Sequence, residues 1–342
     1  MDFLVKLACA VRRSSGLMRA RAWIAVGILA AVAPAQAAEQ VKVRLDFLPY
    51  GLHGPFYLAQ EKGWFKEKGL EVEIEDGNGT GPALALMAAN KYDIAQISLG
   101  ALPIARDKGM PVKAIAAILR KGDWGLVVDE KSGIKTPRDL EGKTILYSAG
   151  SAETPFIDIY LKRVGVDKAK VNMVNVDLSA KIASYMGGKG DAMLSAVPLY
   201  TIKGLTPRPS HGILFSEAGI NVPSFGLVAN EATIAKRPQV LQDFVAVFQR
   251  AWNEARTSAG ADEAVAALIK HRPNAKLNPA LMKAQIEAVY PYLSTEASQG
   301  KPLLWMPPSD WKDAVDVMAD LKLIKAGTRP ESIYTNQFVP GL

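Results

Sequence analysis

The sequence contains one cysteine, Cys9, among its 342 residues. A single cysteine cannot form an internal disulfide framework or a cysteine-rich metal site. Histidine is also scarce, and His53, His211 and His271 are too scattered to form the paired motif of a zinc site. A nucleophile elbow of the Gly-x-Ser-x-Gly type is missing as well. We therefore expect a protein that has no metal, no cofactor and no enzymatic activity.

The N-terminal region lacks a hydrophobic run long enough to span a membrane. Its apolar segment, Ala22–Ala33, has about twelve residues, whereas a membrane helix needs roughly 20. This segment follows a basic stretch and precedes Pro34-Ala35-Gln36-Ala37-Ala38, the order of a secretory signal peptide. We expect residues 1–38 to be that signal, cleaved near Ala37 or Ala38, and the exported protein to be periplasmic. An uncleaved anchor is the minor alternative, as is a twin-arginine signal at Arg12-Arg13, where Ser-Ser-Gly replaces the expected bulky apolar residue.

The positive charge is concentrated in this signal. The whole chain has a formal net charge of +7, but residues 1–38 hold five basic residues and one acidic residue, so the remainder carries about +3. We therefore expect no nucleic-acid partner. With 49% hydrophobic and 22% charged residues, the chain is too apolar to be disordered. Because single cores stop growing near roughly 250–300 residues, the length predicts two lobes.

Short β-rich runs alternate with helical stretches from Val41 on, the pattern of an α/β protein with mostly parallel sheets. We predict strands at 41–47, 70–75, 93–98, 112–118, 125–128, 143–147, 171–176, 191–197, 212–215 and 224–229, and later helices at 239–259, 261–271, 278–290 and 310–321. The expected fold class is α/β and two-lobed, each lobe a mostly parallel sheet flanked by helices. Residues 39–124 and 226–342 form lobe 1 with the C-terminal helices, and 125–225 form lobe 2. Two crossovers, near Trp124–Val128 and Pro223–Val228, make the hinge.

Five turns that follow predicted strands share a proline at a helix start. Proline suits the first turn of a helix because its missing N–H has no helical partner there. In open α/β sheets, ligands bind at the carboxyl edge of the strands, where such helix starts lie. Alternatively, the prolines mark the starts of helices and have no connection with ligand binding. The turns are His53-Gly54-Pro55-Phe56, Thr80-Gly81-Pro82-Ala83, Ala101-Leu102-Pro103-Ile104, Glu153-Thr154-Pro155-Phe156 and Ala196-Val197-Pro198-Leu199.

The run Leu45–Ala59, followed by Lys62-Gly63-Trp64-Phe65 and Lys68-Gly69-Leu70, resembles the periplasmic solute-binding proteins of ABC importers. It is most similar to the branch that includes binders of thiamine-precursor pyrimidines, with the alkanesulfonate, nitrate and taurine binders as relatives. Leu45, Asp46, Pro49, His53 and Tyr57 match the pattern of that branch, while Phe47 replaces its Trp and Tyr50 its Asn. Further matches are Asp93-Ile94-Ala95, Gly109–Lys113, Thr136–Lys143 and Arg237-Pro238.

This resemblance implies the two-lobed fold of type II periplasmic binding proteins. It also implies that a small-molecule ligand is enclosed between the lobes and passed to an ABC permease driven by its ATPase. We expect a monomer whose ligand is flat, heteroaromatic or weakly charged.

Four candidate ligand-binding residues surround the end of the first predicted strand. Asp46 could accept hydrogen bonds from a ligand amine or ring N–H, or cap a neighbouring loop. Phe47 and Tyr50 could stack on a flat ligand or pack in the core. His53 matches the histidine of the related branch, yet a lone histidine can equally be structural.

The loop Asp76-Gly77-Asn78-Gly79-Thr80-Gly81 is rich in glycine, but Pro82 occupies the position of the third glycine of a dinucleotide fingerprint. We instead expect Asn78, Thr80 and backbone N–H groups to meet a small solute. The remaining candidates lie in corresponding loops or at the crossover, where loop and core roles are the alternatives: Ser98, Gly100, Trp124, Ser148, Ser151 and Asp177.

Three other functions stay open. An alkanesulfonate, nitrate or taurine type of anion binder could use helix N-termini, although arginine, the usual bidentate partner of a buried dianion, is scarce in these loops. A pyrimidine-processing enzyme is disfavoured because the enzymes of the related branch carry a cysteine cluster, which the chain after residue 38 lacks. A binding protein that serves a sensor or another type of importer is the third.

Overall fold

The computed structural model describes residues 38–341, so the predicted signal peptide lies outside the described residues except for Ala38. From Glu39 on, the chain forms one compact unit. Among the described residues, no helix is both long and apolar enough to cross a membrane.

The first sheet has five strands in the order β2-β1-β3-β10-β4. β1 pairs in parallel with β2 and β3, whereas β10 pairs antiparallel with β3 and β4. Four strands therefore run in one direction and β10 runs against them. β3 is buried along its whole length, as expected of a central strand covered on both faces. The strands are β1 (Glu39–Arg44), β2 (Leu70–Glu75), β3 (Ile94–Ser98), β4 (Val112–Ala117) and β10 (Phe225–Asn230).

The second sheet repeats this plan in the order β7-β6-β8-β5-β9. β6 pairs in parallel with β7 and β8, while β5 is antiparallel to both β8 and β9. Again only one strand is reversed, so the expectation of mostly parallel sheets holds for strand direction in both. The strands are β5 (Trp124–Asp129), β6 (Thr144–Tyr147), β7 (Asn172–Asn175), β8 (Ala192–Ala196) and β9 (Ser210–Leu214).

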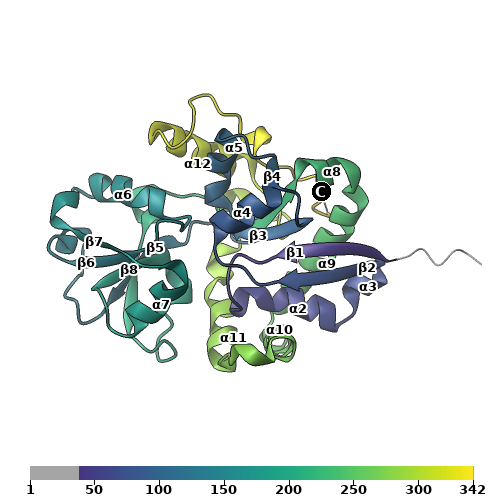
Figure 1. Ribbon diagram of the computed structural model, residues 1–342, viewed down its shortest axis with the longest axis horizontal. Coiled ribbons are helices and arrows are strands. Elements are labelled where there is room, and N and C mark those ends of the chain that lie inside the picture. Colours follow the sequence, from purple (N-terminus) through teal and green to yellow (C-terminus); the bar gives the residue numbers. More distant parts are fainter. Residues whose placement is uncertain (1–37, 342) are drawn as a thin grey trace, which may run out of the picture. The chain divides into compact units, whose positions relative to one another are not determined.

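Helices cover the faces of both sheets (Figure 1). Those between the strands are α2 (Gly54–Glu61), α3 (Trp64–Glu67), α4 (Thr80–Ala88), α5 (Leu102–Asp107), α6 (Ile157–Arg163) and α7 (Leu178–Met186). After β10 come α8 (Glu231–Lys236), α9 (Pro238–Ala255), α10 (Ser258–His271), α11 (Pro279–Ala288) and α12 (Pro308–Asp320). The segments after α11 and α12 return to the first sheet, where Leu304 and Tyr334 form isolated bridges to β4.

Most of the proline turns open helices, as predicted. Pro55 and Pro103 lie in the first turns of α2 and α5, and Pro155 lies in a 3-10 turn that leads into α6. The turn at Pro198 differs, since it forms one 3-10 turn, Val197–Leu199, that no α-helix continues. Two prolines, Pro207 and Pro209, follow shortly afterwards and would interrupt a helix there.

The chain passes between the two sheets twice, through residues 118–123 and 215–224. These crossovers are hydrogen-bonded to each other: the Ser224 N–H donates to the Leu119 carbonyl (2.9 Å), and the Gly122 N–H donates to the Asn221 side chain (2.8 Å). β5 and β10 start where the crossovers end. The exact lobe boundaries given above stay a prediction.

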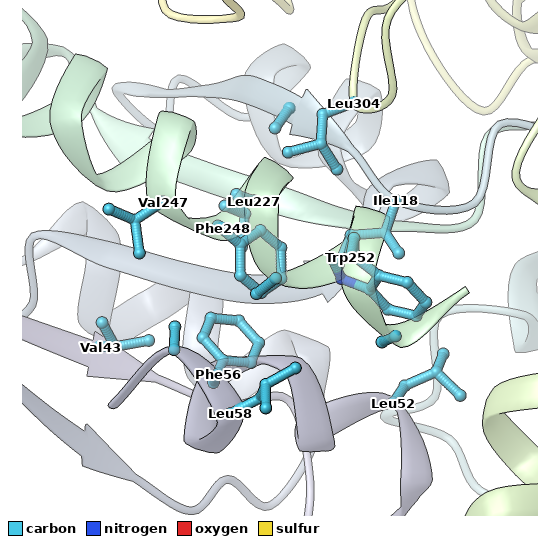
Figure 2. Packing of buried hydrophobic residues seen from close by; sticks show 14 of the residues in the cluster. Val43, Leu52, Phe56, Leu58, Ile118, Leu227, Val247, Phe248, Trp252 and Leu304 are labelled. Carbon is cyan, nitrogen blue, oxygen red and sulfur yellow. The ribbon is translucent and has the colours of Figure 1, made fainter. Parts of the chain in front are cut away.

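The largest core lies between the first sheet and helices α2, α9 and α10 (Figure 2). Phe56 on α2 and Phe248 on α9 pack with ring centroids 4.2 Å apart. Val43 on β1 and Leu227 on β10 are both fully buried in the same cluster. This packing anchors the 3-10 turn Gly51–His53, which precedes α2 and carries one of the candidate site residues.

Candidate ligand-binding site

A cavity lies where the loops at the carboxyl ends of the parallel strands of both sheets meet. Ser98 ends β3 and Ser195 lies near the end of β8, while Trp124 and Phe225 open the reversed strands β5 and β10 at the same edge. The cavity holds about 590 Å³ of space not filled by protein atoms, part of it open to solvent. Its lining is Asp46, Phe47, Tyr50, Gly79, Thr80, Ser98, Trp124, Ser151, Ala152, Glu153, Leu178, Lys181, Ile182, Ser195, Ala196, Leu199, Tyr200 and Phe225.

Asp46 is held in place by one side chain from β3 and two from the segment that leads into α2. Its carboxylate contacts Nε2 of His53 at 2.9 Å, and it accepts hydrogen bonds from Gln96 Nε2 (3.2 Å) and from the Tyr50 hydroxyl (3.3 Å). His53 is fully buried and Asp46 nearly so. Because two oxygens offer about four acceptor positions, the carboxylate keeps acceptor capacity toward the cavity. These contacts orient it without consuming it.

Tyr50 supplies both a ring and a fixed donor to this network. Burial is the main reason that the pKa of Tyr50 lies well above its ordinary value, and the negative charge of Asp46 adds to the shift. The phenol therefore stays protonated and donates to Asp46. Its ring contacts His53, with centroids 4.2 Å apart, and faces Phe225 at 6.3 Å.

The opposite wall carries a buried ion pair. Lys181 on α7 lies with its Nζ 2.8 Å from the Glu153 carboxylate, and it also donates to the Leu194 carbonyl (2.7 Å) and to Ser151 Oγ (3.2 Å). An ammonium has three N–H donors, so these three acceptors use all of them. Lys181 and Glu153 are both buried. The lining thus contains two carboxylates and one ammonium, and the ammonium is already neutralised within the protein.

Seven of the twelve predicted site residues line this cavity: Asp46, Phe47, Tyr50, Thr80, Ser98, Trp124 and Ser151. Trp124 packs against Gly100, where a Cβ atom would come within 2.3 Å of the indole. Gly100 therefore shapes the lining without being part of it. The Thr80 hydroxyl accepts a hydrogen bond from the Ser98 N–H (3.2 Å), which joins the loops that follow β2 and β3.

The other predicted residues lie outside the lining, and ligand contact stays a prediction for them. His53 lies behind Asp46, Asn78 is exposed, and Ser148 donates to the Val176 carbonyl at 2.7 Å. Asp177 is the N-cap of α7 and accepts from the Ser179 N–H at 2.9 Å. This cap fixes the helix start from which Lys181 reaches the cavity.

Sequence reasoning missed the ion pair and most of the second sheet's contribution. Lys181 and Glu153 lie on different elements, and nothing in the sequence links them. The sequence held one signal: Lys181 and Tyr185 are four residues apart, so they share one face of α7, and both are buried. Tyr200 directly follows the proline turn at Ala196–Leu199, and Phe225 opens the strand predicted at 224–229, so their positions at the ligand-binding edge were the signal that could have identified them.

Among the described residues, no group of three or more histidine, aspartate or glutamate side chains could hold a metal ion. The site offers hydrogen-bond acceptors, hydroxyls and aromatic faces, which suit recognition of an organic solute.

Solved structures show the same fold. The alkanesulfonate-binding protein SsuA from Xanthomonas axonopodis pv. citri, bound to MOPS, superposes with a TM-score of 0.66 at 13% identity, over 86% of this chain and 98% of that one. A Candida albicans gene product described as having the generic periplasmic binding protein structural fold gives a TM-score of 0.63 at 14% identity, over 87% and 96%. The predicted two-lobed α/β fold is thereby confirmed.

Relatives of known name are similar along most of the chain. A putative thiamine biosynthesis protein of Haemophilus influenzae is 28% identical, covering 78% of this chain and 84% of its own. A formylaminopyrimidine-binding protein of Halalkalibacterium halodurans is 23% identical, over 82% and 84%. A 4-amino-5-hydroxymethyl-2-methylpyrimidine phosphate synthase of Saccharomyces cerevisiae is also 23% identical, over 89% and 88%.

The resemblance noted from residues 45–59 is confirmed by a family model that covers more than half of the chain. The model, described as NMT1/THI5 like, matches residues 51–264, which include most of the cavity lining from both sheets. The protein belongs to the NMT1/THI5-like family.

Proposed function

We propose that the protein is a periplasmic solute-binding protein of an ABC importer. It captures one small, flat, heteroaromatic or weakly charged solute between its lobes and delivers it to a permease driven by an ATPase. It acts as a monomer after removal of its signal peptide. Two relatives support this class of ligand by their names, the formylaminopyrimidine-binding protein and a riboflavin-binding protein of Chloroflexus aurantiacus.

The observation that carries the proposal is the pairing of an oriented acceptor with aromatic walls. Asp46 is aligned by three side chains at one side of the cavity, where a ring N–H or an amino group could donate to it. Phe47, Tyr50 and Phe225 lie on the side of the first sheet, and Trp124 and Tyr200 on the other. Aromatic faces and one fixed hydrogen-bonding group suit a planar ring that carries N–H donors.

The charges of the lining argue against the anion-binding alternative. Among residues 38–341, no arginine lines the cavity, and its single cation there, Lys181, is bound to Glu153 and two other acceptors. A sulfonate or nitrate would also have to approach the Asp46 carboxylate. The ligand we propose therefore brings hydrogen-bond donors rather than a negative charge.

We also favour binding over the synthase activity named for the yeast relatives. The residues after position 38 contain no cysteine, so a cysteine-dependent step has no thiol to use. Lys181 is fully engaged by Glu153 and carbonyl oxygen, which leaves its amine unsuited to act as a nucleophile.

The test starts from the solute that co-purifies with the natively expressed protein, identified by mass spectrometry. That compound, added back, should raise the melting temperature, because the folded state is stabilised by RT ln(1 + [L]/Kd), where [L] is the free solute concentration and Kd its dissociation constant. Calorimetry should show one site per chain. Turnover of the compound would support the enzyme instead, and binding only of alkanesulfonate or nitrate would support the anion binder.

Replacing Asp46 with Asn keeps the side-chain shape and removes the charge. We expect Asp46→Asn to weaken binding of that solute by about 1–3 kcal/mol, roughly 5- to 150-fold, because one charge-assisted hydrogen bond is lost. The matched control is Asp316→Asn on α12, an exposed carboxylate that pairs only with Lys312 on the surface. Equal affinities of the two variants would remove Asp46 from the site.

A further inference from the structure

A second cavity, separate from the candidate ligand site, is lined by three cationic side chains. Arg120 comes from the first crossover, Arg256 from the C-terminal end of α9, and Lys301 from the loop before Leu304. The cavity holds about 860 Å³ of space not filled by protein atoms, part of it open to solvent. Within the described part of the chain, its lining contains no carboxylate and shares no residue with the lining of the ligand cavity.

Arg120 is the buried member of this group. Its side chain is only 2% exposed, and its Nη2 donates to the Pro302 carbonyl at 2.7 Å. Nε and Nη1 have no hydrogen-bond partner in the part of the chain that the structure describes, and no ion pair within 4.0 Å includes Arg120 there. Burial lowers the pKa of Arg120 to about 10, so the guanidinium still carries its charge at neutral pH. A buried charge without a counter-charge is costly unless another group balances it.

The other two cations add to the positive charge around this cavity. Arg256 and Lys301 are exposed, and neither belongs to an ion pair between residues 38 and 341. After burial, the larger electrostatic effect on the pKa of Arg120 is the raising effect of the Asp310 carboxylate, and Arg256 lowers the pKa by less. Asp310 accepts a hydrogen bond from Thr295 Oγ1 at 2.6 Å, lies outside the lining, and forms no ion pair with Arg120 within 4.0 Å, so it offsets the positive charge from a distance.

Three cations line one cavity: Arg120 is buried with two N–H groups that lack partners among the described residues, Arg256 is exposed, and the Lys301 ammonium lies 5.2 Å from the centre of the Trp305 ring. This combination suits a small oxyanion. Arginine donates in a fork that matches two oxygens of one ligand, and lysine supplies a further charge. The geometry points to a binding site for a free oxyanion with two negative charges, of the phosphate class, held by Arg120, Arg256 and Lys301. The bound ion would join the first crossover to the segment after α11, so it would lie beside the hinge and away from the solute.

Inorganic phosphate is the probe for this site. It is titrated by calorimetry into the full exported chain at constant ionic strength, with chloride as the replaced salt. We expect one saturable site per chain. Arg256→Gln and Lys301→Gln should each weaken phosphate binding by about tenfold, since each removes one charge-assisted contact. Lys108→Gln is the matched control, because Lys108 is an exposed cation at the C-terminal end of α5 and lies outside the cavity.

Arg120→Gln tests the buried member, with circular dichroism to verify that the variant is folded. We expect it to fold, because it removes an unpaired buried charge, and to lose the response to phosphate. Failure of phosphate to bind, an equal response to chloride, or unchanged affinity in the Arg256→Gln/Lys301→Gln double variant would overturn the proposal. Sedimentation with vesicles of anionic phospholipid but no binding of free phosphate would overturn it as well, by assigning the cations to a lipid headgroup.

Discussion

Asp123 combines complete burial with a carboxylate that lacks partners. Neither of its side-chain oxygens has a hydrogen-bond partner among the described residues, although the Ser224 hydroxyl lies near enough to lower the pKa. Burial outweighs that effect and raises the pKa of Asp123 to about 7. Because Asp123 lies in the first crossover and Ser224 in the second, this carboxyl group sits inside the hinge.

The raised pKa of Asp123 has a definite consequence for stability. The unfolded chain releases this proton near pH 4, whereas the folded chain keeps it until about pH 7. The folded protein therefore loses stability as the pH rises through this window. We expect Asp123→Asn to be more stable than the wild type above pH 7, by up to about 4 kcal/mol, and nearly equal to it below pH 4.

Urea denaturation at several pH values measures this difference. Asp167→Asn is a control, since Asp167 is an exposed aspartate that caps a 3-10 turn far from the crossovers in sequence. A constant difference between wild type and Asp123→Asn from pH 4 to pH 8 would show that Asp123 titrates normally.

Single site residues could be predicted where their position after a strand also places them at the ligand-binding edge of the sheet. Asp46, Thr80 and Ser98 could be named because each lies at the end of a strand or directly after a loop, and carboxyl ends of parallel strands share one edge. The Lys181–Glu153 pair could not, because it depends on how α7 packs against the loop after β6. Residue type and spacing carry no information about that packing.

At the scale of elements, the sequence predicted strand positions well because each buried strand is a short apolar run bounded by polar turns. β2 agrees residue for residue with the prediction, and β1 ends at Arg44 rather than at Phe47. The difference has a physical reason: Asp46 and Phe47 turn away from the sheet, and their carbonyls accept hydrogen bonds from Gly79 and Gly77. The strand end is therefore set by the loop that follows β2.

The contact between α2 and α9 stabilises the side of the cavity that is formed by the first sheet and its loops. Phe56 and Phe248 are fully buried, and their rings pack at 4.2 Å between the two helices (Figure 2). We expect Phe248→Ala to lower the free energy of unfolding by about 3–5 kcal/mol, through lost burial and the cavity left behind.

Thermal and urea denaturation measure this loss, with Leu48→Ala as the control. Leu48 is 53% exposed, so its truncation should change stability by no more than about 0.5 kcal/mol. Similar effects of the two substitutions would show that the two helices are not held together by this contact.

For the whole molecule, the two hydrogen-bonded crossovers allow the two lobes to rotate relative to each other about one axis, and they limit other motions of the lobes. We expect the identified solute to make the protein more compact, because the closed form buries the solute from both sides and binds it more tightly. Small-angle scattering with and without saturating solute should show a smaller radius of gyration in its presence. An unchanged radius at saturation would contradict closure, and Asp46→Asn at the same solute concentration gives the matched low-affinity control.

The two-lobed plan was predictable from length and from the duplicate set of strands. The single reversed strand in each sheet was not, because strand direction depends on where the chain enters the sheet. β5 and β10 are both entered from the crossovers, at the edge where the parallel strands end. Their direction therefore follows from connectivity and not from composition.

Because of this connectivity, the second sheet is formed by one segment inserted between β4 and β10 of the first sheet. β4 and β10 are antiparallel neighbours, and the Ile118 N–H donates to the Phe225 carbonyl at 2.8 Å, so the inserted segment leaves and returns at one point. Without that segment, β4 and β10 would form a hairpin, and the strand order of the first sheet would stay the same. The inserted segment can thus be replaced by the corresponding segment of a relative, with both junctions at neighbouring positions in the structure. Eleven of the eighteen residues that line the cavity would change in one step. In the core around α2 and α9, the exchange would reach only the edge formed by Ala196 and Leu199.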